Sequence, residues 1–175
     1  MSKCSLLLTV VVLALAPLGG RAEDWKTFSS KEGKFSVLMY GKPQEQTQEV
    51  KTADGKLALY SVVSPVALDR FVYVNYSDYS AKAIEGKQDA FLDAIAKGNA
   101  SSLKGKLVSQ KKVELGKGKL PGREVLIDLP DKKQLYRSRI VLAGNRLFQV
   151  VALGPEEFVK GKEVGEYLNS FKIGD

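Results

Sequence analysis

The sequence predicts an α+β fold: a single domain in which a twisted, mainly antiparallel sheet is flanked by helices. Three observations support this prediction. After residue 22, most of the chain follows the two-residue period of half-buried strands. Two segments change to the 3.6-residue period of a helix, and tight-turn signals separate neighbouring strands. No linker, repeat or low-complexity run divides residues 23–175, so we expect one core.

The first 22 residues have the order of a secretory signal peptide. Lys3 precedes an apolar run from Leu6 to Leu18, and small residues occupy the two positions that a signal peptidase reads. We therefore predict a signal peptide over residues 1–22, cleavage between Ala22 and Glu23, and export to the periplasm or the cell exterior. The uncharged stretch inside it has 17 residues. Because about 20 residues span a bilayer, an uncleaved anchor is the weaker alternative.

Removal of this leader leaves 153 residues without cysteine or histidine, because Cys4 is the single cysteine of a chain that has no histidine. These absences exclude disulfides, Ser-His-Asp and Cys-His catalysis, and zinc sites built from histidine or cysteine. Loss of Lys3 and Arg21 lowers the formal net charge from +7 to +5, with 25 Lys and Arg against 20 Asp and Glu. Such an excess favours anionic partners, the alternative being a solvated lysine-rich surface.

The first strands are expected between residues 35 and 78. Apolar side chains alternate over residues 35–39, which predicts a strand that the Gly41-Lys-Pro43 turn ends. Within residues 50–63, Asp54-Gly55 predicts a two-residue hairpin turn that pairs Ala53 with Lys56 and Val50 with Leu59. Residues 70–78 form a further strand, and both of its faces are apolar or aromatic.

The middle of the chain begins with a helix. Asp89 opens a segment in which Phe91, Leu92 and Ile95 share one stripe, and Gly98-Asn99 is expected to end it. Strands follow over residues 107–115, 123–129, 134–143 and 146–153. The last two form a hairpin around Gly144-Asn145, which pairs Ala143 with Arg146 and Ile140 with Gln149.

The C-terminal segment is the clearest amphipathic helix of the sequence. Gly154-Pro155 ends the preceding strand. Val164, Tyr167, Leu168 and Phe171 then follow at i, i+3, i+4 and i+7, which places them on one helical face. We expect this face to cover the sheet.

Arg137 and Arg139 are the candidate partner-binding residues. They lie on one face of their strand, and the hairpin register adds Val141, Phe148 and Val150 to that face. A planar guanidinium beside apolar groups binds carboxylates or phosphates through paired hydrogen bonds. The alternative is that the arginine stems cover the sheet and the guanidinium groups pair with local acids.

Other candidate motifs have simpler explanations. Glu156-Glu157 stands where a helix begins, and Asp128 and Asp131 flank Pro130 in a turn. Gly116-Lys-Gly118 is not followed by a helix, so a turn explains it better than phosphate binding. The chain contains no calcium-loop motif, and we predict no cofactor and no metal. The aromatic residues Trp25, Phe28, Phe71, Tyr73, Tyr76 and Tyr79 are expected to pack rather than to form a sugar-binding surface.

The start of the mature chain resembles the PsbP-like domains. The resemblance rests on Trp25-Lys-Thr-Phe28, on Glu32-Gly-Lys-Phe35-Ser-Val37 and on Gly41-Lys-Pro43, and the final Leu168-Asn-Ser-Phe171 is similar too. It implies an α/β/α sandwich around a twisted antiparallel sheet. It also implies a binding module, since the family includes an extrinsic photosystem subunit and a Ran-binding nuclear import factor. Retention of ions through histidine is not expected here, because the chain has none.

These observations predict an exported, non-enzymatic binding module that docks a protein or an anionic envelope component. We expect a monomer, no specific nucleic-acid partner, and membrane contact only through the transient signal segment. One alternative is a carrier of an apolar small molecule held between sheet and helices. The other is a carboxylate-based hydrolase, which requires two acidic groups that converge in a cleft.

Overall fold

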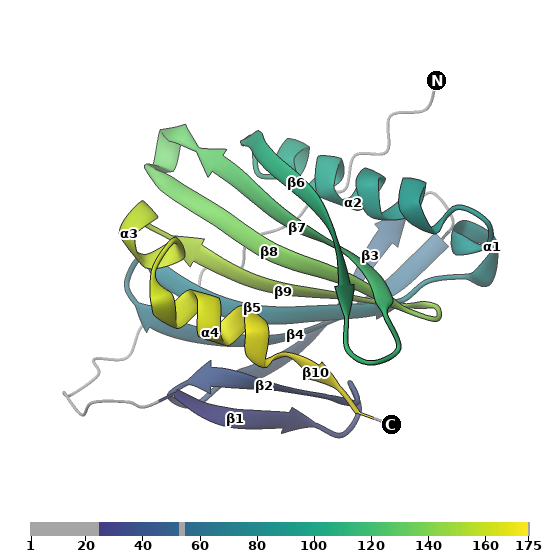
Figure 1. The fold of residues 1–175 in the computed structure, drawn as a ribbon, viewed down its shortest axis with the longest axis horizontal. Coiled ribbons are helices and arrows are strands. Elements are labelled where there is room, and N and C mark those ends of the chain that lie inside the picture. Colours follow the sequence, from purple (N-terminus) through teal and green to yellow (C-terminus); the bar gives the residue numbers. More distant parts are fainter. Residues whose placement is uncertain (1–24, 53–54, 175) are drawn as a thin grey trace.

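The computed structural model describes residues 25–52 and 55–174. Two antiparallel sheets face each other, and helices cover them (Figure 1). The predicted signal peptide and its cleavage site at Ala22 and Glu23 lie outside the described residues. Within those ranges, no helix combines the length and the hydropathy needed to cross a membrane.

The larger sheet has seven strands in the order β3-β4-β5-β9-β8-β7-β6, each antiparallel to its neighbours. The strands predicted after residue 50 all belong to it, and the predicted bounds 70–78 and 134–143 are those observed. Its members are β3 (Gln44–Thr52), β4 (Gly55–Ala67), β5 (Arg70–Asp78), β6 (Lys106–Leu115), β7 (Leu120–Leu129), β8 (Gln134–Ala143) and β9 (Arg146–Gly154).

A second, three-stranded sheet contains the first strand that the sequence predicted. It pairs β2 (Phe35–Tyr40) with β1 (Trp25–Ser30) on one side and with β10 (Lys172–Ile173) on the other. The alternating Phe35, Val37 and Met39 are buried in the core shared with the large sheet. β2 therefore packs on the face of the large sheet rather than extending its edge.

The helices lie on opposite faces of the large sheet (Figure 1). On one face, α1 (Ala81–Ile84) and α2 (Gln88–Ser102) cover a core that includes Leu92, Ile140 and Val151. On the other face, α3 (Glu156–Val159), α4 (Lys162–Ser170) and the small sheet enclose a second core around Phe148. A single turn of 3₁₀ helix, η1 (Pro130–Lys132), joins β7 to β8. These layers confirm the predicted α+β architecture.

The predicted C-terminal stripe is confirmed. Val164, Tyr167 and Leu168 of α4 are fully buried, and Phe171, at the C-terminal cap, is 2% exposed. The Tyr167 hydroxyl donates a hydrogen bond to the Tyr73 carbonyl of β5 at 2.8 Å, so the helix is attached to the sheet by a polar contact as well as by burial.

The predicted end of the first long helix at Gly98-Asn99 is wrong, because α2 continues to Ser102. The chain leaves the helix only at Lys104, whose φ of 54° is left-handed, and the Gly105 amide donates to the Ala100 carbonyl at 2.9 Å. This is a Schellman ending. Gly105 is required there, because a Cβ would lie 2.5 Å from Ile127.

The two predicted hairpins had different outcomes. The pairing around Gly144-Asn145 is confirmed, with Ala143 opposite Arg146 and Ile140 opposite Gln149. The pairing predicted around Asp54-Gly55 is wrong, because Val50 lies opposite Leu57 instead of Leu59, and Lys56 lies opposite Lys51 instead of Ala53. Gly55, which was expected in the turn, instead pairs with Thr52 as the first residue of β4, where its φ is 119°. The shift spans two residues in the pairing, so each side chain keeps its predicted face.

Candidate functional site

The two candidate arginines lie on β8 and face the layer formed by α3 and α4. Arg139 is opposite Glu124 of β7 and Val150 of β9, whereas Arg137 is opposite Leu126 and Ala152. The predicted arginine face is therefore present. The two side chains, however, have different surroundings.

Arg139 is bound to the end of helix α4. Its Nη1 donates to the Leu168 carbonyl at 3.0 Å, and its Nη2 donates to Asn169 Oδ1 at 3.1 Å and to Glu124 Oε2 at 3.3 Å. A cation at a helix C-terminus satisfies unpaired carbonyls and interacts favourably with the helix dipole. Arg139 therefore holds α4 in place. Because only 14% of its side chain is exposed, its positive charge is largely buried.

Arg137 is more accessible and has unused donors. Its Nη2 donates to Glu124 Oε1 at 2.9 Å, its side chain is 26% exposed, and no other partner for it lies among the described residues. It lines a groove of about 240 Å³ together with Ser109 and Lys111 of β6, Leu126 of β7, and Lys160 at the end of α3. We call this feature the basic groove.

Positive charge exceeds negative charge in the basic groove. Burial of Glu124 disfavours its charged form, but hydrogen bonds and charges from Arg137 and Arg139 outweigh burial and lower the pKa of this carboxyl. Lys111 lies opposite Glu124 across the strand pair, and Lys160 pairs with Glu156. Among the residues that line the groove, three cations thus stand against one carboxylate, Glu124, which leaves a net charge of +2.

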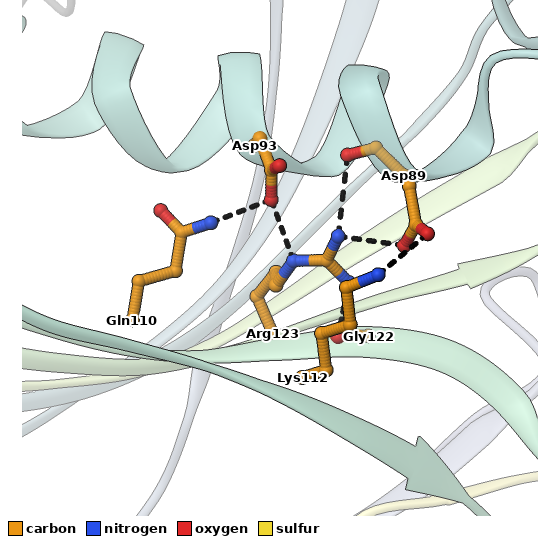
Figure 2. A network of polar contacts seen from close by, with 6 residues as sticks. All are labelled: Asp89, Asp93, Gln110, Lys112, Gly122 and Arg123. Carbon is orange, nitrogen blue, oxygen red and sulfur yellow. Dashed lines mark hydrogen bonds and ion pairs between the residues drawn. The ribbon is translucent and has the colours of Figure 1, made fainter.

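A further arginine, which the sequence analysis did not single out, organises the opposite face. Arg123 of β7 is 2% exposed beneath α2, where Nε donates to Asp93 Oδ1 and Nη2 to Asp89 Oδ1, both at 2.7 Å (Figure 2). From β6, Lys112 reaches Asp89, and Gln110 reaches Asp93 (Figure 2). The sequence did contain one indication that Arg123 is buried, because it falls at the same alternate positions of its strand as the side chains that face the core.

Asp89 and Asp93 are therefore a convergent pair of carboxylates, but both are ion-paired with Arg123 and attach α2 to the sheet. Hydrogen bonds from Lys112 and then from Arg123 lower the pKa of Asp89. A glycosidase acid needs the opposite shift, so that the carboxyl stays protonated near neutral pH. The geometry gives the hydrolase alternative no support at this pair.

The other acidic motifs have the structural roles that the sequence indicated, except that Asp128 lies in strand β7 rather than in a turn. Glu156 and Glu157 form the first turn of α3, and Asp131 lies in the 3₁₀ turn that starts at Pro130. Among residues 25–52 and 55–174, no three acidic, histidine or cysteine side chains gather in a way that would hold a metal ion.

The candidate aromatic residues mostly pack, as predicted. Trp25 contacts Tyr40 and Tyr167, and Tyr76 stacks on Tyr60 at a centroid separation of 4.8 Å. Tyr73 and Tyr79 also line a second cavity, of about 40 Å³, beside α2. Ligand pockets usually measure about 300–1,000 Å³, so neither cavity described here supports the alternative of an enclosed apolar cargo.

Comparison with known proteins identifies the architecture. Neither a model of a known family nor a curated protein matches the sequence. The solution structure of cyanobacterial PsbP (CyanoP) from Synechocystis sp. PCC 6803 aligns with a TM-score of 0.56 at 12% identity, over 92% of this chain and 98% of that chain. The overall fold described above thus recurs in a solved protein of very different sequence, and the chain has a PsbP-like fold.

Proposed function

We propose that this protein is an exported, non-enzymatic binding module that holds an anionic group of its partner in the basic groove. The observation that carries the proposal is the state of Arg137: one edge of its guanidinium is fixed by Glu124, while its other donors have no partner within the described residues.

The partner group that suits this groove is a carboxylate or a phosphate. Glu124 orients the Arg137 plane before binding, so less side-chain entropy is lost when an anion accepts its free donors. Lys111 and Lys160, which line the same groove, supply charge without a fixed direction. The volume of about 240 Å³ accommodates one such group, with the rest of the partner outside.

Export and the lack of catalysis rest on the sequence together with the site. The leader predicts translocation. The chain has no histidine, its single cysteine is in the leader, and the convergent carboxylates are paired with Arg123. The PsbP-like fold is compatible with a binding role, although a fold by itself does not determine function.

The test measures binding of the exported protein to anionic probes. Vesicles containing phosphatidylglycerol and soluble polyphosphate present the same chemistry from two sources, a lipid headgroup and a polymer, and phosphatidylcholine vesicles provide the baseline. Arg137→Gln should weaken binding to one of the anionic probes about tenfold, which corresponds to about 1.4 kcal/mol. Raising the salt concentration should weaken it further.

Lys97→Gln is the matched control, because it removes the same charge from an exposed position of α2 on the opposite face. An equal loss in both variants would mean that net charge alone drives binding, and the proposal would then be wrong. Absence of binding to both anionic probes and to polyglutamate, which presents carboxylates, would also contradict it.

A further inference from the structure

The cavity on the α2 side of the large sheet differs in chemistry from the basic groove. Its volume is about 40 Å³, and it lies between the C-terminal half of α2 and the strands β3, β4, β5 and β9. The described residues that line it carry no charge. Amide side chains on three separate elements converge there, namely Asn75 of β5, Asn99 of α2 and Gln149 of β9. We call this feature the amide pocket.

Several hydrogen-bonding groups of the amide pocket are unused. Asn99 Nδ2 donates to Gln149 Oε1 at 2.7 Å and to the Tyr136 hydroxyl at 3.2 Å. The Ser77 hydroxyl is buried and has no hydrogen-bond partner within the described chain, and the Asn75 amide forms no hydrogen bond there. Buried polar groups are normally satisfied, so the unpartnered Ser77 hydroxyl points to a polar occupant.

The walls add flat apolar surface to these polar groups. Tyr73, Tyr79 and Tyr136 line the amide pocket together with leucines such as Leu57 and Leu147. Tyrosine rings pack against the C–H faces of sugar rings, and amides both donate to and accept from hydroxyl groups. An ionic ligand would have no counter-charge among the described lining residues, whereas a polyhydroxylated neutral ligand would meet both kinds of group.

We propose that the amide pocket binds a neutral saccharide. Since one water needs about 10–15 Å³ of such space, the cavity holds roughly three water-sized groups. That is enough for the carbon and the oxygen of one exocyclic hydroxymethyl group. In this arrangement the ring of that sugar lies outside the cavity, beside the half-buried Tyr79. This site faces away from the basic groove and uses none of its residues, so the inference goes beyond the proposed function and stands independently of it.

The test is an NMR titration of the isotope-labelled exported protein with maltohexaose, cellohexaose and chitohexaose, each at millimolar concentration. At least one oligosaccharide should shift the side-chain amide signals of Asn75, Asn99 and Gln149 in a saturable manner. Asn75→Ala should weaken that binding at least tenfold, because it removes an amide on which no described intramolecular hydrogen bond depends.

Gln88→Ala is the matched control, since it removes an exposed amide at the start of α2, and binding should be unchanged. If Asn75→Ala disturbs the amide spectrum of the fold, Asn75→Ser provides the same test with a smaller change. Absence of shifts with all three sugars would overturn the inference. Shifts produced only by an uncharged peptide of similar length would overturn it as well, because they would identify a peptide groove.

Discussion

Replacing Arg123 should separate two contributions of a buried guanidinium to stability, namely the volume that it fills and the charge that it carries. Arg123→Ala removes a side chain that is 2% exposed and leaves its volume empty beneath α2. Truncation of a large buried side chain costs about 2–5 kcal/mol through lost burial and cavity formation. Removing a desolvated charge offsets part of that cost, because the guanidinium no longer has to leave water. We therefore expect Arg123→Ala to lower the free energy of unfolding by about 2–3 kcal/mol.

Arg123→Met fills most of the same space without the charge. Because Asp89 and Asp93 are 62% and 41% exposed, their carboxylates return to water when the guanidinium is absent. Apolar replacement of a buried ionic group is often neutral, so this variant should lose less than about 1 kcal/mol. Lys112→Met is the control, because this exposed lysine contacts the same Asp89 and should change stability little.

The assay combines urea unfolding and thermal unfolding with hydrogen exchange of the α2 amides. In Arg123→Ala, the melting temperature should fall by about 4–12 °C, given about 2–4 °C per kcal/mol for a chain of this size. Exchange should accelerate first at the N-terminal half of α2, where Asp89 and Asp93 are held. Equal stability of the alanine variant and the wild type would refute the assignment of Arg123 as the anchor of α2.

Three further predictions follow from the same contacts. Arg139→Gln should destabilise the protein by about 1 kcal/mol and accelerate hydrogen exchange in the last turn of α4, because the carbonyl of Leu168 loses its cation. Unchanged exchange in that turn would contradict the capping role. Lys104→Gly should raise the free energy of unfolding, measured in urea, by about 1 kcal/mol, because the left-handed φ of 54° favours glycine at the end of α2. A decrease would show that the lysine side chain makes stabilising contacts of its own. The pKa values of Asp78, Asp89 and Glu124 are lowered in the folded state by their arginine and lysine partners. These carboxylates should therefore stabilise the fold above about pH 4, the ordinary carboxyl value, and this contribution should be lost as the pH falls below it. Urea midpoints that do not change between pH 5 and pH 2.5 would contradict this last expectation.

Features that depend on local pattern could be predicted from the sequence alone. The two-residue alternation predicted residues 70–78 and 134–143 as strands, and the 3.6-residue period predicted the buried stripe of α4. Glycine and asparagine at 144–145 set the register of their hairpin, because a short turn between long strands allows one pairing. At Asp54-Gly55 the same reasoning was wrong about Gly55, because this residue has the positive φ expected of a turn glycine but pairs with Thr52 as part of β4.

Which polar groups meet, by contrast, depends on how distant parts of the chain fold together. Alternation placed Arg137 and Arg139 on one face, but Glu124 reaches them because β7 pairs with β8, and Leu168 reaches Arg139 because α4 folds back over the sheet. The anchor at Arg123 and the amide pocket likewise bring together side chains from separate elements of the chain. Local periodicity indicates which face of a helix or strand is buried. The partner of each polar group depends instead on strand order and on how the helices pack on the sheet, and neighbouring residues in the sequence do not encode either of these.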